Sequence, residues 1–297
     1  MLNGLDLLVI VVMALAAASL LAMLLNCING QFVASIREVM IPFYDTGKGL
    51  TVNCMGAVDV TGGEFYQQDI SSVAERVRDG ALFFAIAVNN FETGLGMEVK
   101  SMLCDSGVTL LCPEVRVGSG IYRTSIGNLA VITYDRTRKS GSDYGDKIQI
   151  MRHILVLKRK KADYIIAYIN NRPGDYAEKN SGSRLCKILA HMGADYIIGI
   201  TPERRDSGST YLKPDGGLAR SVYSLGTFLS DSRESSPKRV MIRLKLDAIQ
   251  GKFQLVEETY FPYFHMDDGG MVSLLDRQSA ALSPERGTRY RAEIEDE

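Results

Sequence analysis

Continuous and alternating apolar stretches divide the chain into segments typical of strands and of helices. The segment from Leu82 to Val88 is apolar throughout, which is typical of a strand covered on both faces. From Leu185 to Met192 apolar residues recur at helical spacing, and the pattern stops at Gly193. By the same criteria we expect strands at 51–60, 108–112, 128–134, 163–169 and 195–200, and helices at 69–79, 96–105 and 147–161.

Predicted strands and helices alternate as far as residue 200. This alternation predicts an α/β domain with a mostly parallel sheet that is covered by helices. In the predicted helix 147–161 we expect Ile148, Met151 and Leu155 to face the sheet.

The C-terminal third of the chain has a different pattern. After Leu212 three segments alternate apolar and polar residues with no helix between them, which predicts an antiparallel part that closes the domain. The α/β domain is therefore expected to span residues 51–265. The polar and charged remainder, residues 266–297, is expected to be a flexible tail.

The N-terminal segment contains no charged residue from Leu7 to Leu25. As a helix its roughly 19 residues would extend about 28 Å, enough to cross the hydrocarbon core of a bilayer. A cleaved signal peptide and a buried core helix are the alternatives, although no lysine or arginine precedes the segment as a signal peptide requires. We expect a single-pass anchor in the cell membrane over residues 1–28 and a connector over 29–50, with the side of the main domain left open.

Composition argues against several classes of function. The net charge of −1 provides no basic field for nucleic acid, so no nucleic-acid partner is expected. Only three histidines are present, which is few for a site built from several imidazole ligands. The five cysteines include no Cys-x-x-Cys pair, which argues against a disulfide framework and a zinc site and favours small buried side chains.

Candidate chemistry lies where the predicted strands end, because ligands of open α/β sheets bind at the carboxyl ends of strands. Several segments rich in polar residues and glycine occupy such positions or follow them. They are residues 56–59, 88–96, 169–176, 199–205 and 223–228.

The order and spacing of these segments resemble the CapA family, the bacterial proteins of poly-γ-glutamate capsule synthesis. The family pattern ANNHxxDxG is similar to residues 88–96, and its ADxxIxxxHWG to the segment that begins at Ala162. Its GADxxxGxHPH is similar to the segment that begins at Gly193, and its YSLGNF to residues 223–228. The resemblance extends over roughly residues 52–262. It implies a calcineurin-like metallophosphatase-type layered sheet with covering helices, and a place in cell-envelope or capsule polymer assembly.

The positions that would hold metal in this family carry different residues here. Ala57 stands for the aspartate after the first strand, and Phe91 stands for the histidine of ANNH. Alanine and phenylalanine have no atom that binds a metal, and neutral amides bind it poorly. Other replaced family positions are Gly94, Asn170, Ile200, Thr201, Glu203 and Thr227. The resemblance, taken with these replacements, predicts no metal, no cofactor and no catalytic residue.

The polar residues that remain at the strand ends are candidates for contact with a ligand. Asp59 shares a strand face with Ala57 and is an alternative ligand for a rebuilt site. Asn89 and Asn90 either contact a ligand or brace a strand-end turn, and Arg204 either meets an anionic ligand or lies in a solvated loop. The full set of candidates is Asp59, Asn89, Asn90, Asn170, Asp175, Glu203, Arg204 and Thr227.

Three functions are consistent with the sequence. The first is a membrane-anchored, non-catalytic CapA-like domain that binds or scaffolds in cell-envelope or capsule polymer assembly. The second is a metal-dependent, phosphoesterase-like hydrolase with a rebuilt site, and the third is a purely structural subunit of a membrane complex. The expected partners are the membrane, through the N-terminal helix, and capsule-assembly proteins or an anionic polymer.

Overall fold

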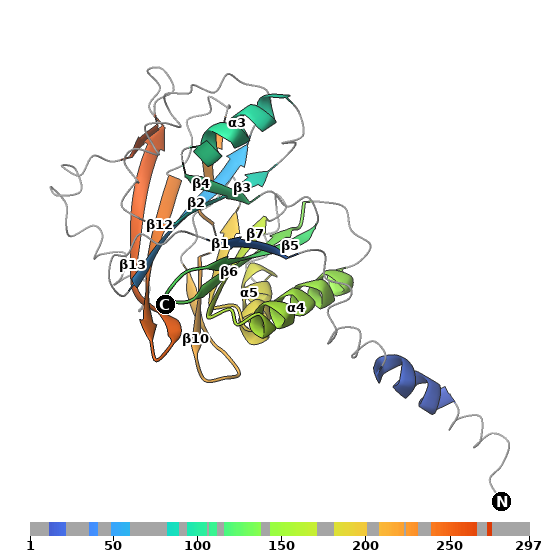
Figure 1. Ribbon diagram of the computed structural model, residues 1–297. Helices are drawn as coiled ribbons and strands as arrows, with labels where there is room; N and C mark the ends of the chain where they lie inside the picture. The colour runs from blue at the N-terminus through green and yellow to red at the C-terminus, as the bar shows by residue number, and fades with distance from the viewer. Residues whose placement is uncertain are drawn as a thin grey trace, which may run out of the picture.

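Two mixed β-sheets lie face to face in the computed structural model, and helices lie on the outer face of one sheet and beside an edge strand of the other (Figure 1). Each sheet contains seven strands. The chain is thus a mixed α/β protein, as its sequence predicts, but with two sheets where the pattern indicated one. The structure describes residues 12–21, 36–40, 49–59, 82–88, 94–105, 107–111, 116–137, 143–170, 181–200, 208–222, 224–230, 239–265 and 272–274.

The first sheet, sheet A, has the strand order β1-β5-β6-β7-β8-β10-β9. β6, β7, β8 and β10 run parallel to one another, whereas β5 and β9 pair antiparallel at the two sides. Its strands are β1 (Arg37–Met40), β5 (Val117–Arg123), β6 (Asn128–Asp135), β7 (Tyr164–Asn170), β8 (Tyr196–Ile200), β9 (Ser209–Leu212) and β10 (Leu218–Val222).

The second sheet, sheet B, has the order β14-β13-β12-β2-β3-β4, and β11 also pairs with β2. β2, β3, β4 and β11 form its parallel part, and the long hairpin of β12 and β13 forms its antiparallel part, as expected for the last two C-terminal segments. The first of the three segments was expected to be antiparallel as well, but it contains β10 and β11, which pair in parallel with β8 and with β2 in different sheets. Its strands are β2 (Gly49–Asp59), β3 (Leu82–Val88), β4 (Val108–Leu111), β11 (Thr227–Ser230), β12 (Arg239–Ile249), β13 (Lys252–His265) and β14 (Val272–Leu274).

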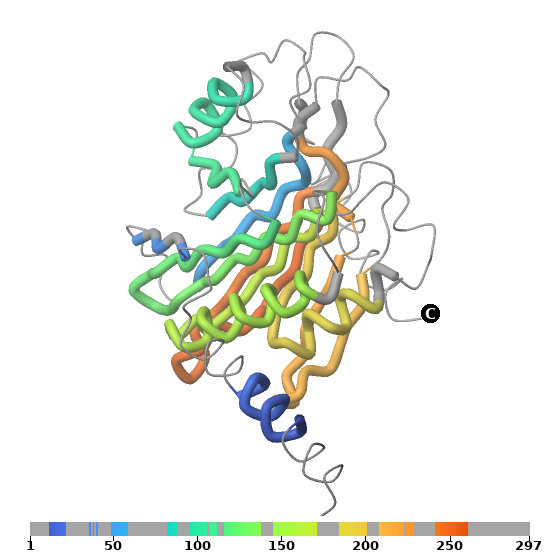
Figure 2. Tube along the Cα trace, turned by 90° about the vertical axis from the view of Figure 1, so that its right-hand side faces the viewer, coloured from blue at the N-terminus to red at the C-terminus, as the bar shows by residue number. Residues whose placement is uncertain are grey.

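Within the described ranges, three helices pack on the sheets. α4 (Asp143–Arg159) and α5 (Ser181–Met192) lie side by side on the outer face of sheet A, and α3 (Gly94–Asp105) packs beside β4 of sheet B (Figure 2). α5 buries Leu185 and Leu189, as its apolar pattern predicts. The helix expected over 69–79 lies outside the described residues.

The buried face of α4 differs from the expected one. Met151 and Leu155, expected to face the sheet, are 38% and 41% exposed. The face is shared with two polar residues, Asp146 and His153, so the apolar stripe is interrupted and the periodicity favours the wrong side of the helix. The side chains that this part of α4 buries are Ile150, His153, Ile154 and Leu157.

The principal core lies between the two sheets. Phe84 of β3 and Tyr122 of β5 face each other there, with ring centroids 4.9 Å apart in an edge-to-face arrangement. The hydroxyl of Tyr168 on β7 donates to the backbone carbonyl of Phe84 at 3.3 Å. Because β3 belongs to sheet B whereas β5 and β7 belong to sheet A, these contacts fix the two sheets face to face.

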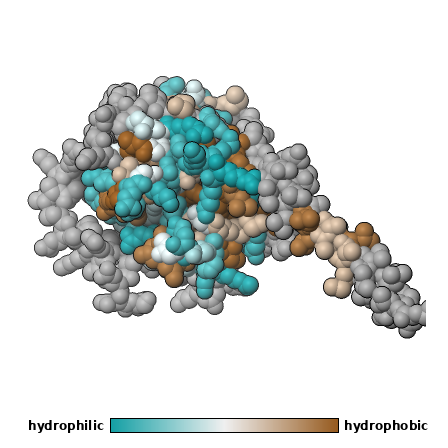
Figure 3. Space-filling model, turned by 60° about the horizontal axis from the view of Figure 1, so that its bottom comes forward, coloured by the Kyte–Doolittle hydropathy of each residue, from teal (hydrophilic) through white to brown (hydrophobic). Residues whose placement is uncertain are grey.

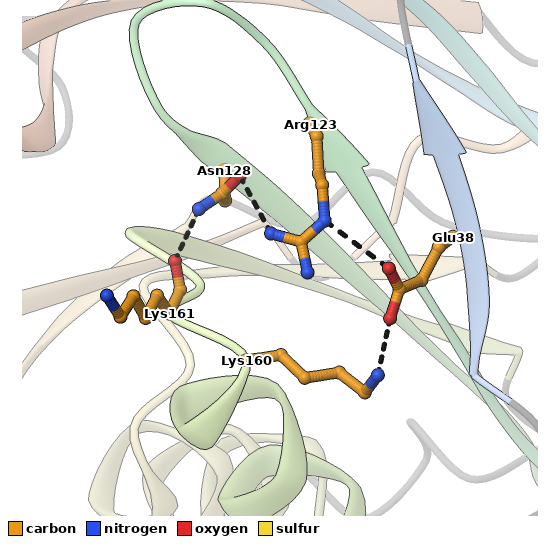
Figure 4. A network of polar contacts seen from close by, with 5 residues as sticks. All are labelled: Glu38, Arg123, Asn128, Lys160 and Lys161. Carbon is orange, nitrogen blue, oxygen red and sulfur yellow. Dashed lines mark hydrogen bonds and ion pairs between the residues drawn. The ribbon is translucent and has the colours of Figure 1, made fainter.

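β1 lies within residues 29–50, where we expected a connector. It pairs in parallel with β5 at the edge of sheet A, and Glu38 secures it by binding Lys160 and by accepting a hydrogen bond from Arg123 at 3.3 Å (Figure 4). The amide of Asn128 extends the network to the carbonyl of Lys161 at 2.8 Å. The hydrogen bond from Lys160 lowers the pKa of Glu38, since it favours the charged carboxylate.

The structure describes parts of both terminal segments expected from the sequence. Within the predicted tail, β14 pairs with β13. Residues 12–21 of the predicted anchor are helical. Among the residues that the structure describes, no helix is long and apolar enough to span a membrane.

Candidate functional site

The turn at residues 224–226 joins the carboxyl ends of strands from both sheets. The backbone amide of Leu225 donates to the carbonyl of Gly199 on β8 at 3.2 Å. The carbonyl of Gly226 accepts from the amide of Ala57 on β2 at 3.0 Å. Parts of three segments singled out in the sequence, 56–59, 199–205 and 223–228, therefore meet at one edge of the two sheets.

Two glycines permit this close approach of backbones. A side chain at Gly56 would place its Cβ only 2.1 Å from the carbonyl oxygen of Gly226. Gly226 has a φ of 71°, a left-handed conformation that glycine adopts without strain, and its amide donates to the Ser224 hydroxyl at 3.1 Å. The Ser-Leu-Gly part of the YSLG element is thus a sheet-to-sheet joint.

Among the candidate residues, Thr227 and Asp59 lie on neighbouring strands at this edge. Thr227 begins β11 and stands opposite Ala57 in the parallel pairing with β2. Asp59 ends β2, where its backbone stands opposite Val88 and Ser230; its side chain lies outside the described part. The pairing of β11 with β2 therefore brings Thr227, Ala57 and the backbone of Asp59 together.

Asn170 ends β7 on the other sheet, and its side chain is buried. Its amide nitrogen donates to Oδ1 of Asp135 at 3.0 Å. The same oxygen accepts from the backbone amide of Thr137 at 3.0 Å and from the Thr137 hydroxyl at 2.6 Å. The backbone carbonyl of Asn170 accepts from the amide of Arg136 at 2.8 Å. Asn170 therefore braces the turn that follows β6.

Asp135 is a site residue that the sequence analysis missed. It ends β6 in register with Asn170 and is buried beside it. Its position directly after the apolar strand segment was visible in the sequence, because carboxyl ends of neighbouring parallel strands share an edge. The Asp135–Asn170 pair is the one place where the described strand ends gather a buried carboxylate and amide.

The other candidates, Asn89, Asn90, Asp175, Glu203 and Arg204, lie outside the described residues. Within the described ranges, no group of three or more histidine, cysteine, aspartate or glutamate side chains is arranged to hold a metal ion. The side chain of Ala57 has no ligand atom, and Asn170, whose amide nitrogen binds Asp135, has only one neutral oxygen to offer. These described positions do not fit a two-metal centre, which needs several fixed anionic or imidazole ligands.

The Ala-Asp-Tyr-Ile-Ile sequence occurs twice, at residues 162–166 and 194–198, and serves structure at the opposite edge. Asp163 accepts a hydrogen bond from the backbone amide of Asn128 at 2.7 Å. Asp195 accepts one from the amide of Ile165 at 2.8 Å, and it also binds Lys213 at 2.6 Å. Each aspartate thus ties the beginning of its strand to the beginning of the neighbouring strand in sheet A. Burial raises the pKa of Asp195, while Lys213 opposes the rise.

A serine and a histidine also meet beneath α4. Ser119 Oγ lies 2.7 Å from His153 Nδ1, and burial lowers the pKa of the imidazole, which favours the neutral ring. The nearby carboxylate of Asp146 is bound by Arg116 at 2.6 Å and by the hydroxyl of Tyr134 at 3.1 Å. Within the described residues, then, no carboxylate orients His153 as nucleophilic catalysis by serine requires. The pair is interpreted as a packing contact between α4 and β5.

Comparison with known proteins yields coarse structural likenesses only. No protein-family model matches the chain, and no curated protein matches its sequence. The calcineurin-like phosphoesterase YfkN of Bacillus subtilis is similar at a TM-score of 0.43 and 10% identity, with 83% of this chain and 99% of that one covered.

Two further solved structures are similar at the same level of sequence identity. The purple acid phosphatase PPD1 of yellow lupin has a TM-score of 0.42 and 10% identity, with 78% of this chain and 54% of that one covered. Vps29 of Entamoeba histolytica, solved with zinc, has a TM-score of 0.28 and 10% identity, with 75% and 97% covered. The likeness to these three structures is coarse, and no family, activity or metal follows from it for this chain.

Proposed function

We propose that this protein is a membrane-anchored, non-catalytic domain of CapA type that binds a partner or polymer in cell-envelope assembly. One observation carries the non-catalytic part of the proposal. At the strand-end edge, Ala57 and Asn170 occupy positions where the resembling family has metal ligands, and both are engaged in hydrogen bonds within the protein. Positions that carry neither a charged nor an imidazole side chain do not suit a metal centre.

Few metal-binding atoms are available at these two positions. Two-metal hydrolysis needs charged or imidazole ligands that hold both ions and lower the pKa of a bound water. The backbone amide of Ala57 is used to join β2 to the turn at Gly226, at 3.0 Å. The Asn170 side chain braces the turn after β6 through Asp135, at 3.0 Å. Neither contact uses a metal-binding atom, and the two side chains together offer only the neutral amide oxygen of Asn170, which binds metal poorly.

The membrane and envelope parts of the proposal rest on sequence. The uncharged segment from Leu7 to Leu25 supports an anchor, and the CapA-like order of motifs supports an envelope role. A reporter fused after Glu297 in living cells tests the topology. A reporter signal on the cytoplasmic side would remove direct handling of an external polymer from the proposal. Solubility of the full chain without detergent would contradict the anchor.

Metal content tests the absence of catalysis. The full chain, purified in detergent, would be analysed for bound metal, for a thermal shift with Mn²⁺ or Zn²⁺, and for hydrolysis of a panel of phosphoesters. We expect no stoichiometric metal, no shift and no hydrolysis. Stoichiometric metal together with turnover would overturn the proposal.

A metal-dependent hydrolase with a rebuilt site is the second candidate. The observation that favours it is the buried carboxylate of Asp135, which lies beside Asn170 at the strand-end edge. Asp135→Asn and Asp59→Ala test it, and Asp163→Asn at the opposite edge is the matched control. Turnover that is lost in the first two variants and kept in the third would establish this alternative.

A further inference from the structure

The end of the molecule opposite the candidate site has its own chemical character. We call it the basal end, and define it by residues 124–127, 158–163, 213–217 and 249–252. The first and the last of these segments lie close together, because a Cβ on Gly127 would come within 2.7 Å of Phe253, which directly follows the last segment. β6, β7, β8 and β10 all begin here, whereas the candidate site lies where parallel strands end.

Exposed charge at the basal end is predominantly positive. The exposed basic residues there are Lys158, Arg159, Lys161 and Lys252, and the exposed acidic residue is Asp215. Asp215 lies 3.6 Å from the ammonium group of Lys213, so part of its charge is already compensated. Figure 3 faces this end and shows hydrophilic side chains gathered over its middle, with apolar residues beside them.

Large apolar side chains are exposed at or next to the same end. Leu212 and Leu218 stand opposite each other in the β9–β10 hairpin and are 66% and 64% exposed. Ile249, at the β12–β13 turn, is 40% exposed, and Met40, at the end of β1, is 74% exposed. Met40 pairs with Arg123, directly before residues 124–127. Apolar side chains at turns, flanked by lysine and arginine, are typical of surfaces that meet the interface of a membrane.

The proposed anchor reaches the domain beside these residues. Glu38 holds β1 against Lys160, within the basic run at the end of α4, and against Arg123 (Figure 4). The uncharged N-terminal segment ends at Leu25, and the eleven-residue step to Ile36 spans at most about 40 Å when extended. A chain anchored through that segment therefore keeps the bilayer within about 40 Å of the place where β1 joins the domain.

We propose that the basal end docks on the anionic headgroups of the bilayer that holds the N-terminal segment, an inference that rests on the proposed anchor. The basic side chains bind lipid phosphates, and the exposed leucines enter the headgroup region. This orientation turns the strand-end edge, with Ala57, Asn170 and Thr227, away from the membrane and towards a partner in the aqueous phase.

Energy transfer to labelled lipid measures this docking. The chain contains no tryptophan, so a single Ser125→Trp at the basal end reports alone. Met97→Trp on α3, where the native side chain is 63% exposed and remote from the basal end, is the control. The full chain would be reconstituted in vesicles of phosphatidylcholine alone or with phosphatidylglycerol, each containing a dansyl-labelled lipid.

We expect stronger transfer from the tryptophan at position 125 in the anionic vesicles, weakened by high salt because salt screens exposed charges. Removing three charges by Arg159→Gln, Lys161→Gln and Lys252→Gln should weaken docking roughly a hundredfold, at about fivefold per charge. The pair Arg184→Gln and Lys187→Gln, exposed on α5, is the matched control and should change nothing. Leu212→Gln with Leu218→Gln should weaken docking, whereas Met151→Gln with Leu155→Gln should not.

Vesicle sedimentation separates this inference from the proposed anchor. Sedimentation of the protein with neutral vesicles tests the N-terminal segment alone. If the protein does not sediment with neutral vesicles, sedimentation with anionic vesicles still tests the basal end. Equal transfer from positions 125 and 97 in both lipids would overturn the inference. So would an unchanged response after the three basic substitutions. Saturable binding of soluble polyglutamate at the same residues, without binding to anionic vesicles, would replace the membrane by a polymer and also overturn it.

Discussion

The hydroxyl of Tyr196 on β8 donates a hydrogen bond to the carboxylate of Glu258 on β13 at 2.7 Å, and so links sheet A to sheet B. The hydroxyl of Tyr260 binds the same oxygen, and Arg220 binds the other at 2.6 Å. Burial raises the pKa of Tyr196, which keeps its hydroxyl protonated as a donor. This polar link lies inside a largely apolar interface, where a lost partner is costly.

Glu258→Gln should therefore destabilise the fold more than Tyr196→Phe. We expect about 1 kcal/mol for the tyrosine and about 1.5–3 kcal/mol for the glutamate, which loses hydrogen bonds to a charged group. Arg220 is about half exposed, so its ion pair with Glu258 should contribute little to the free energy of unfolding. Urea unfolding of both single variants and the double variant measures the coupling. Additive effects would show that the two side chains do not act together.

Removing the Asn170 side chain should leave the buried Asp135 carboxylate with one donor fewer. Asn170→Ala is expected to lower the free energy of unfolding by about 1–3 kcal/mol. Asn170→Asp should be worse at neutral than at acid pH, because two adjacent carboxylates repel when both are ionised. Thr137→Val is the control for the loss of a donor without a new charge, because it removes the hydroxyl that donates to Asp135. Denaturant unfolding at neutral and at acid pH measures both effects. A loss of stability in Asn170→Asp that is the same at both pH values would contradict the expected repulsion.

Two glycines at the sheet-to-sheet joint should respond differently to alanine. Gly226→Ala creates no clash, because nothing lies within 4 Å of the new Cβ. Its cost comes only from holding an alanine in a left-handed backbone conformation. Its cost should be about 1–2 kcal/mol, as for Gly107→Ala, which has a φ of 83° and similarly open space. Gly56→Ala places a Cβ 2.1 Å from a backbone oxygen and should cost about 3 kcal/mol or more. Thermal unfolding of the three variants tests this order.

Stability should fall as the medium becomes acidic, partly through His153. Burial lowers the pKa of His153 below its ordinary value of 6.5, so the unfolded chain takes up the proton at higher pH than the folded chain. The contribution of this residue is therefore complete above about pH 6.5 and is lost as the pH falls through the folded-state pKa. His153→Gln should flatten the pH dependence of the melting temperature in that range. His191→Gln, an exposed control, should leave it unchanged.

The described cysteines should differ in reactivity. Burial raises the pKa of Cys54 and of Cys186 to about 12, so both remain thiols at neutral pH, whereas Cys104 is exposed. Peptide mapping after iodoacetamide treatment should find Cys104 alkylated first among these three. Denaturant should make the other two react as well. Early alkylation of Cys54 in the folded protein would contradict the buried position.

Much of the secondary structure could be predicted, because single strands carry their own pattern. The apolar run at residues 82–88 became β3, and 195–200 contains β8. The presence of two sheets could not be predicted in this way. A strand between a sheet and a helix is apolar on both faces, as is a strand between two helices, so Leu82–Val88 is consistent with either arrangement.

The sequence indicated at which edge of the sheets the candidate residues lie, but not which contacts their side chains make. The turn at 224–226 and the end of β2 do meet, and the order of motifs indicated as much. What the sequence could not supply was the partner of each polar group. Asn170 was a candidate for contact with a ligand, and the structure shows that its amide nitrogen binds Asp135. Asp163 and Asp195, part of the motifs that suggested a family, tie strand beginnings together at the opposite edge.

The position of β2 also affects how the protein can assemble during synthesis. β2 is made early, yet two of its three neighbours, β11 and β12, come from residues 227–230 and 239–249. A ribosome must therefore release most of the chain before one side of β2 acquires its strand partners, and such distant pairings are slow to form. Nascent chains stalled before residue 227 would expose the open side of β2, and chaperones or proteases would meet the protein there first.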